Sequence, residues 1–237
     1  MISMIIVACT QGYRILDLTR RSAEFEGVKN SMVIFGDAVE SVAWIPESTY
    51  RVRYTPRIGC LQLISSATNY EISTTIDGGE PINLYSHPTG VVSYRIRGVT
   101  PASAYKESVE GDDDLMTLSS DGLSNIVLQR IDGWARINMD FKVRITHVKN
   151  TIIQGENVDL IKIWVIVITT SNKSYSGEFD LTASGNRTTG WLSPQPYVGT
   201  NVTVTVGLWQ RSSSVDFKIT SSKVYFQLIV GEVSVFV

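Results

Sequence analysis

The stretch Gly133–Val148, "GWARINMDFKVRITHV", has the strongest periodicity in the chain. Its apolar members alternate with polar ones; the apolar set is Ala135, Ile137, Met139, Phe141, Val143 and Ile145, and the polar set is Arg136, Asn138, Asp140, Lys142 and Arg144. A period of two is that of a strand with one face buried and one in water, whereas a helix would place Asp140 and Arg144 among the apolar residues. The stretch therefore predicts one long strand in a largely β protein.

Shorter runs with the same character recur along the chain. Val, Ile, Thr and Tyr gather in "TYRVRY" (49–54) and "VVSYRIR" (91–97), and Gly, Asn, Asp, Ser and Pro separate such runs. The "DGGE" at 77–80 supplies glycines for the positive φ of a tight hairpin. Short strands at this spacing are typical of a sandwich or barrel. The predicted fold class is all-β, an antiparallel β-sandwich, with two β domains in tandem as the alternative.

The run Asn157–Thr170, "NVDLIKIWVIVITT", loses its alternation after residue 162. A strand that is apolar on both faces must be covered twice, by its own core and by another layer, a second domain or a neighbouring subunit. The residues predicted for such an interface are Ile163, Trp164, Ile166 and Ile168. In the closing run 223–237 the apolar phase slips by one residue at Gly231-Glu232, which predicts a β-bulge.

The N-terminal stretch "MISMIIVACTQ" (1–11) has the residue types of a lipoprotein cleavage box at 6–9. No Lys or Arg precedes the short apolar run, as a signal peptide would require, so we expect an uncleaved, buried first strand instead. No run reaches the roughly 18 apolar residues of a membrane-spanning helix, so no membrane span is expected.

The length and the net charge of the chain restrict its domain organisation and its expected binding partners. The chain has 237 residues, a net charge of −2 and two cysteines, Cys9 and Cys60. We expect residues 1–100 to form an N-terminal β domain or the first half of a sandwich, 101–122 an acidic loop or linker, and 123–237 a second β unit. The slight acidity offers no long-range attraction for phosphate, so direct nucleic-acid binding is not expected.

The acidic stretch Glu110–Gly122, "EGDDDLMTLSSDG", raises the question of a metal site. A calcium loop spaces its oxygen ligands at alternating positions, but Asp112, Asp113 and Asp114 are consecutive, so a solvated loop is the preferred interpretation over a weak Ca²⁺ site. The two histidines, His87 and His147, are too few for a three-histidine zinc site. With no P-loop, nucleophile elbow or dinucleotide motif, we predict no metal, no cofactor and no enzymatic activity.

The irregular stretch 184–200, "SGNRTTGWLSPQPYVGT", contains the one candidate binding site. Trp191 and Tyr197 flank two prolines there and could form an exposed aromatic platform for a sugar ring or a partner. In the alternative interpretation Trp191 folds back to close the end of the sandwich.

From Leu123 to Val237, the order of strands in "GWARINMDFKVRITHV", "NVDLIKIWVIVITT", a long loop, "NVTVTVGLW" and "KVYFQLIVGEVSVFV" resembles the jelly-roll domains of virion structural proteins. The resemblance covers about half of the chain and rests on strand order and length. It implies a subunit of a viral or phage capsid, spike or fibre head, located in the virion and packed against copies of itself and other virion proteins. The basic internal arm of such proteins is missing from this sequence.

Three classes of function remain open, of which a hydrolase on a β scaffold is the least favoured, because fold alone never excludes an enzyme. The other two are the main expectations. The first is a non-enzymatic structural protein that self-assembles, a capsid or virion subunit, because doubly apolar strands require partners. The second is a carbohydrate- or receptor-binding β-sandwich module, an adhesin or fibre head, which would use Trp191, Tyr197 and the long loops.

Overall fold

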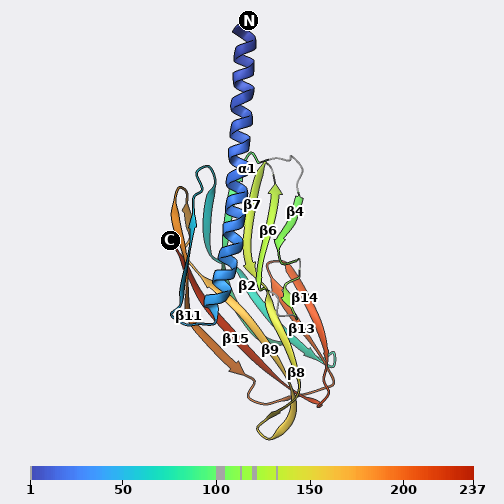
Figure 1. Ribbon diagram of the computed structural model, residues 1–237. Helices are drawn as coiled ribbons and strands as arrows, with labels where there is room; N and C mark the ends of the chain where they lie inside the picture. The colour runs from blue at the N-terminus through green and yellow to red at the C-terminus, as the bar shows by residue number, and fades with distance from the viewer. Residues whose placement is uncertain (1, 100–104, 113, 119–121, 132) are drawn as a thin grey trace.

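The computed structural model describes the chain except residues 1, 100–104, 113, 119–121 and 132, and leaves the side chains of 2–8, 105 and 131 undescribed. One long helix, α1 (Ile2–Ala43), is joined to two β-sheets (Figure 1). The seven-stranded sheet contains β1 (Thr49–Tyr54), β11 (Phe179–Leu192), β15 (Lys223–Phe236), β9 (Glu156–Thr169), β8 (Val143–Ile153) and β5 (Met116–Thr117) in this order, with β12 (Tyr197–Val198) beside β15. The eight-stranded sheet contains β14 (Arg211–Lys218), β13 (Asn201–Leu208), β2 (Cys60–Ile76), β3 (Ile82–Arg97), β7 (Trp134–Phe141), β6 (Ser124–Ile131) and β4 (Tyr105–Glu110), with β10 (Lys173–Tyr175) beside β2.

The two sheets form a sandwich-like architecture, which confirms the predicted β-sandwich class. Most neighbouring strands are antiparallel, whereas β15 pairs with β9, and β5 with β8, in parallel. The jelly-roll type stays a prediction. Both sheets contain strands from residues 1–100 and strands from residues 123–237.

The predicted N-terminal strand is wrong, because residues 2–43 form α1. The physical reason is a spacing of three and four, which puts apolar side chains on one helical face; the buried members of that face are Phe25, Val28, Met32, Phe35, Val39 and Val42. No proline interrupts the segment before Pro46, and Pro46 lies three residues beyond the last helical residue, where a helix commonly stops.

The single long strand predicted for residues 133–148 is two strands, because the chain passes from one sheet to the other at Lys142. The apolar face is confirmed: the six alternating apolar residues are between 0% and 2% exposed. Lys142 was assigned to the wet face, but it is only 5% exposed and forms an ion pair with Asp112. The crossing between sheets buries this position, so part of the acidic stretch neutralises a buried cation.

Strand β9 is covered on both faces, as its apolar pattern requires. Ile161, Ile163, Val165 and Val167 belong to a core between the two sheets. Ile166 and Ile168 belong to a second core that includes the buried face of α1. We call these the sheet core and the helix core. The second layer over β9 is therefore provided by this chain itself.

The same two cores explain the phase slip in β15. Val224, Phe226, Leu228 and Val230 face the sheet core, whereas Val233 and Val235 face the helix core. The β15–β9 register is continuous through Gly231, so the predicted bulge in β15 is wrong. The irregularity lies in the neighbouring strand β11, between Gly185 and Arg187.

The predicted hairpin at 77–80 is confirmed, because β2 and β3 pair as neighbours and Asp77 and Gly78 have φ of 49° and 72°. The stretch 184–200 is less irregular than expected, since β11 continues to Leu192. Eight positions of this stretch, between Ser184 and Leu192, pair with β15.

Candidate functional site

The C-terminal half of α1 is fixed to the sandwich by close backbone contacts. A Cβ on Gly231 would lie 2.5 Å from the carbonyl oxygen of Ala43, and one on Gly185 would overlap the carbonyl oxygen of Val42. Only glycine at these positions lets β15 and β11 approach the helix so closely. The last turns of α1 therefore rest directly on the seven-stranded sheet.

Glu24 fixes the middle of the helix. Its carboxylate accepts hydrogen bonds from the amides of Arg57, Ile58 and Gly59, at 2.7–3.1 Å, and from the hydroxyl of Tyr94 at 2.7 Å. Burial opposes the charged form, but these hydrogen bonds outweigh it and lower the pKa of Glu24. The charged carboxylate thus connects α1 to the segment between β1 and β2.

Before Glu24 the helix extends beyond the sandwich (Figure 1). Among the described hydrogen bonds, the one nearest the N-terminus that joins α1 to the sandwich is donated by Arg21 to the carbonyl of Arg97, at 2.8 Å. Residues 9–20 are exposed apart from the half-buried Gly12. We call residues 9–20 the projecting segment.

The projecting segment carries large apolar side chains in water. Tyr13, Ile15, Leu16 and Leu18 are 75%, 64%, 57% and 42% exposed. In the described residues no helix combines the length and the apolar character needed to cross a membrane.

Exposed apolar and small residues form a stripe along residues 9–34 of the helix; its members are Cys9, Tyr13, Leu16, Ala23, Gly27 and Ile34. Successive members are separated by three, four or seven residues, and positions 20 and 30, which complete this repeat, hold Arg20 and Asn30. At about 100° per residue, Tyr13 and Leu16 point about 120–180° away from Phe25, which faces the sandwich. We call this the outer stripe.

The residues predicted for an interface lie inside the chain. Ile163 and Ile166 are fully buried, in the sheet core and helix core respectively, and Ile168 is 3% exposed. The half-buried Trp164 packs edge-on against Trp44 of the segment after α1, with ring centroids 5.3 Å apart. These four side chains therefore offer little surface to a second subunit.

The two residues of the predicted aromatic platform, Trp191 and Tyr197, lie opposite different positions of β15. Trp191 pairs opposite Leu228 and is 42% exposed. Tyr197 pairs opposite Val224, and its ring packs edge-on against Phe226 with centroids 5.6 Å apart. Tyr197 thus takes part in the sheet core, and Trp191 is the member that remains accessible.

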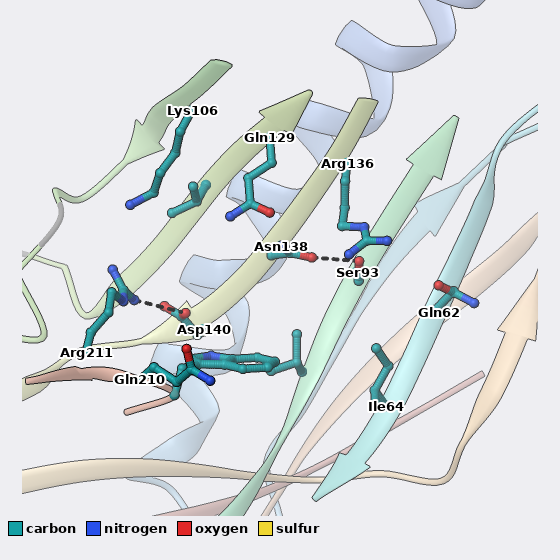
Figure 2. A pocket seen from close by; sticks show the side chains of 13 residues that line it. Gln62, Ile64, Ser93, Lys106, Gln129, Arg136, Asn138, Asp140, Gln210 and Arg211 are labelled. Atoms are coloured by element: carbon teal, nitrogen blue, oxygen red, sulfur yellow. Dashed lines mark hydrogen bonds and ion pairs between the residues drawn. The ribbon is translucent and has the colours of Figure 1, made fainter. Parts of the chain in front are cut away.

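A polar groove of about 520 Å³ crosses the face of the eight-stranded sheet opposite the helix core (Figure 2). Buried Val91 and Val127 lie in its lining, which otherwise is mostly polar; the other lining residues are Gln62, Ile64, Ser93, Lys106, Gln129, Arg136, Asn138, Asp140, Trp209, Gln210 and Arg211. They come from β2, β3, β4, β6, β7, the turn between β13 and β14, and the first residue of β14. The volume lies within the range of small-ligand sites, about 300–1,000 Å³.

Two polar pairs order the groove. The hydroxyl of Ser93 donates to Oδ1 of Asn138 at 2.7 Å. Asp140 accepts a hydrogen bond from Asn125 at 2.5 Å and forms an ion pair with Arg211 at 3.7 Å. Burial raises the pKa of Asp140, although the Asn125 hydrogen bond and nearby cations oppose the shift. These contacts hold Asn138 and Asp140 in fixed orientations.

Sequence reasoning missed both surfaces. The three-and-four spacing after Phe25 was the available signal for α1 and hence for the outer stripe. For the groove, the alternation of 134–141 placed Arg136, Asn138 and Asp140 on a common face, but Trp209 had no recognisable signal. Its backbone has a φ of 59°, unusual for a bulky residue.

Within the described ranges, no three His, Cys, Asp or Glu side chains gather as a metal site. Asp113 and Asp121 of the acidic stretch lie outside those ranges. Nε2 of His147 donates to the carboxylate of Asp159 at 3.0 Å, so this ring is a hydrogen-bonded structural histidine.

Comparison of the chain with protein-family models, curated proteins and solved structures finds no match.

Proposed function

We propose that this protein is a structural subunit that assembles with copies of itself through the outer stripe of α1. The observation that carries the proposal is the exposed apolar stripe on a helix whose first half projects from the sandwich. A helix of 42 residues is about 63 Å long, at about 1.5 Å per residue, so it can contact a partner over several turns.

A second copy of the helix is the occupant that fits best. A repeat of three and four residues is the pattern that lets two helices pack side by side, and Ala23 and Gly27 permit close approach. The stripe faces away from the chain's own sandwich, so a neighbouring helix can approach without displacing it. The projecting segment, residues 9–20, is short, and a helical segment as short as this is only marginally stable in water on its own. Packing against a second helix would stabilise it.

The assembly test is to measure the mass of the chain in solution as a function of concentration. We expect the unaltered chain to associate, and the double variant Leu16→Glu/Ile34→Glu to stay monomeric over the same range. Each new carboxylate would have to be desolvated in a helix–helix contact.

Leu18→Glu is the matched control. Leu18 is exposed and apolar, but it points about 160° away from Leu16 around the helix. It should leave association unchanged. If the unaltered chain is monomeric at every concentration, or if the double variant associates equally well, the proposal fails. A viral or phage origin stays a prediction of the sequence alone.

A further inference from the structure

We propose that the polar groove binds a saccharide that carries carboxylate groups. The groove shares no residue with the outer stripe, so this inference is independent of assembly through α1. The groove brings together one exposed aromatic ring, several amide side chains and one exposed guanidinium group around the same hollow of the sheet (Figure 2).

The aromatic ring belongs to Trp209, which is 53% exposed at the turn between β13 and β14. Its backbone amide donates to the hydroxyl of Thr68 at 2.8 Å, which holds the left-handed turn in place. A two-residue hairpin turn with positive φ normally favours Asn or Gly. A tryptophan kept there, in the lining of a groove, offers an apolar face for the carbon skeleton of a sugar ring.

The amides supply hydrogen bonds for hydroxyl groups. Oδ1 of Asn138 is occupied by Ser93, so the Asn138 side-chain NH₂ is the part that is available to a ligand. Gln129 is half-buried on β6, and Gln210 follows Trp209. The half-buried Gln62 on β2 already donates to Ser174 at 3.3 Å, so its side-chain oxygen is the part that is available. An amide both donates and accepts, as does a hydroxyl, and therefore a polyhydroxylated ligand suits this lining.

Arg136 gives the groove its preference for an acid. The side chain is exposed, and in the described residues it forms no ion pair or side-chain hydrogen bond. The carboxylate in the lining, Asp140, is already bonded to Asn125 and close to Arg211. A guanidinium group binds a carboxylate through two parallel hydrogen bonds, so Arg136 can orient an acidic sugar.

A nucleotide is the less suitable ligand. Phosphate sites commonly use a helix N-terminus or a glycine-rich loop. Here the groove lies on a sheet face opposite the helix core, and its lining contains no glycine. Of the other two cations in the lining, Arg211 pairs with Asp140 and Lys106 has an interaction of its own, so Arg136 matches an isolated carboxylate better than a run of phosphates.

Isothermal titration calorimetry of the full chain would test the assignment, with trigalacturonate as the acidic probe and maltotriose as the neutral one. We expect trigalacturonate to bind at least about tenfold more tightly, because a charge-assisted bidentate pair contributes on the order of one tenfold step or more. Inorganic sulfate, added at the same concentration as trigalacturonate and at constant ionic strength, should not compete with trigalacturonate for the groove. Calorimetry is preferable to fluorescence, because the chain has five tryptophans.

Three variants assign the binding to the groove. Arg136→Gln should remove the preference for the acidic probe, and Trp209→Asn should weaken both saccharides, while asparagine still tolerates the positive φ. Arg51→Gln is the control: it removes an exposed cation from β1, in the other sheet and outside the groove. That variant should bind as the unaltered chain does.

The proposal is overturned if neither saccharide binds, if maltotriose binds as tightly as trigalacturonate, or if sulfate competes as well as the sugar. It is also overturned if Arg136→Gln, with an unchanged melting temperature, retains the preference. Tighter binding of a nucleoside triphosphate than of trigalacturonate would show a different ligand class.

Discussion

At the scale of single residues, buried carboxylates that accept several hydrogen bonds hold distant segments together. Asp159 is fully buried and accepts from the amides of Asn150 and Thr220, at 3.1 and 2.9 Å, and contacts His147 at 3.0 Å. Burial alone would raise its pKa, but the hydrogen bonds lower it to about 2. The side chain thereby links β8, β9 and the segment before β15.

Asp159→Asn should lower the free energy of unfolding by about 1–3 kcal/mol, because an amide NH₂ would face backbone donors. The folded-state pKa of about 2 is below the ordinary 3.8, so the carboxylate stabilises the fold above about pH 4, and the effect is lost as the pH falls toward 2. Urea unfolding at neutral and acidic pH measures both effects. Asp216→Asn, which changes an exposed carboxylate, is the control; equal losses would contradict the assignment.

Glu24→Gln should also destabilise the fold, by about 1–3 kcal/mol, because the neutral amide is a weaker acceptor for three backbone amides and Tyr94. Since the pKa of Glu24 is lowered in the folded state, its contribution is present above the ordinary pKa and is lost as the pH falls through the lowered one. The free energy of unfolding of the variant should therefore fall less steeply with decreasing pH than that of the unaltered chain.

The control for Glu24 is Glu26→Gln on the same helix. Glu26 is exposed and pairs with Lys29 one turn later, and such surface pairs contribute at most about 1 kcal/mol. Denaturation midpoints that are the same for both variants would show that the carboxylate of Glu24 is not the anchor.

At the scale of elements, the decisive contact is between the end of α1 and the seven-stranded sheet. Gly231 is where β15 changes from facing the sheet core to facing the helix core, and Ala43 covers it. Strand β11 adjusts to the same contact through Gly185 and the irregularity beside it. Two glycines therefore control how closely helix and sheet approach.

Gly231→Ala should lower the free energy of unfolding by about 1–3 kcal/mol, because the added methyl group overpacks a backbone contact that cannot move alone. Gly190→Ala in the same sheet has open space at its Cβ and should change stability by less than about 0.5 kcal/mol. Thermal and urea unfolding would compare them. Equal melting temperatures for the two variants would mean that the sheet and helix are not in close contact.

At the scale of the whole molecule, α1 has two parts with different stability. The part from Phe25 onward is packed into the helix core, while the projecting segment is exposed. We therefore expect the backbone hydrogen bonds of the projecting segment to open more often than those of the packed part of the same helix.

Amide hydrogen exchange on the monomeric Leu16→Glu/Ile34→Glu chain should be fast for residues 9–20 and slow for residues 28–42. In the associated unaltered chain, residues 9–20 should become protected. Slow exchange of residues 9–20 in the monomer, or no gain of protection on association, would contradict the division of the helix and its role in assembly.

The local pattern of the sequence was sufficient for much of the β architecture. Alternation identified the buried face of residues 135–145, and the glycines at 78 and 79 identified the β2–β3 hairpin, because side-chain direction and turn geometry depend on near neighbours. The wet face of β7 also placed Arg136, Asn138 and Asp140 together. The helix spacing from Phe25 to Val42 was equally local, but the apolar N-terminus before it suggested a strand.

Tertiary structure decided what covers each apolar face and where distant polar groups meet. Nothing near Ile166 in the sequence shows that α1, more than a hundred residues earlier, provides a layer of the same core. Likewise, Lys142 is buried only because the chain changes sheets there, and Trp209 reaches the groove only through the pairing of β13 with β2. A local pattern determines which side of an element avoids water, whereas the identity of its covering partner depends on contacts between segments far apart in the chain.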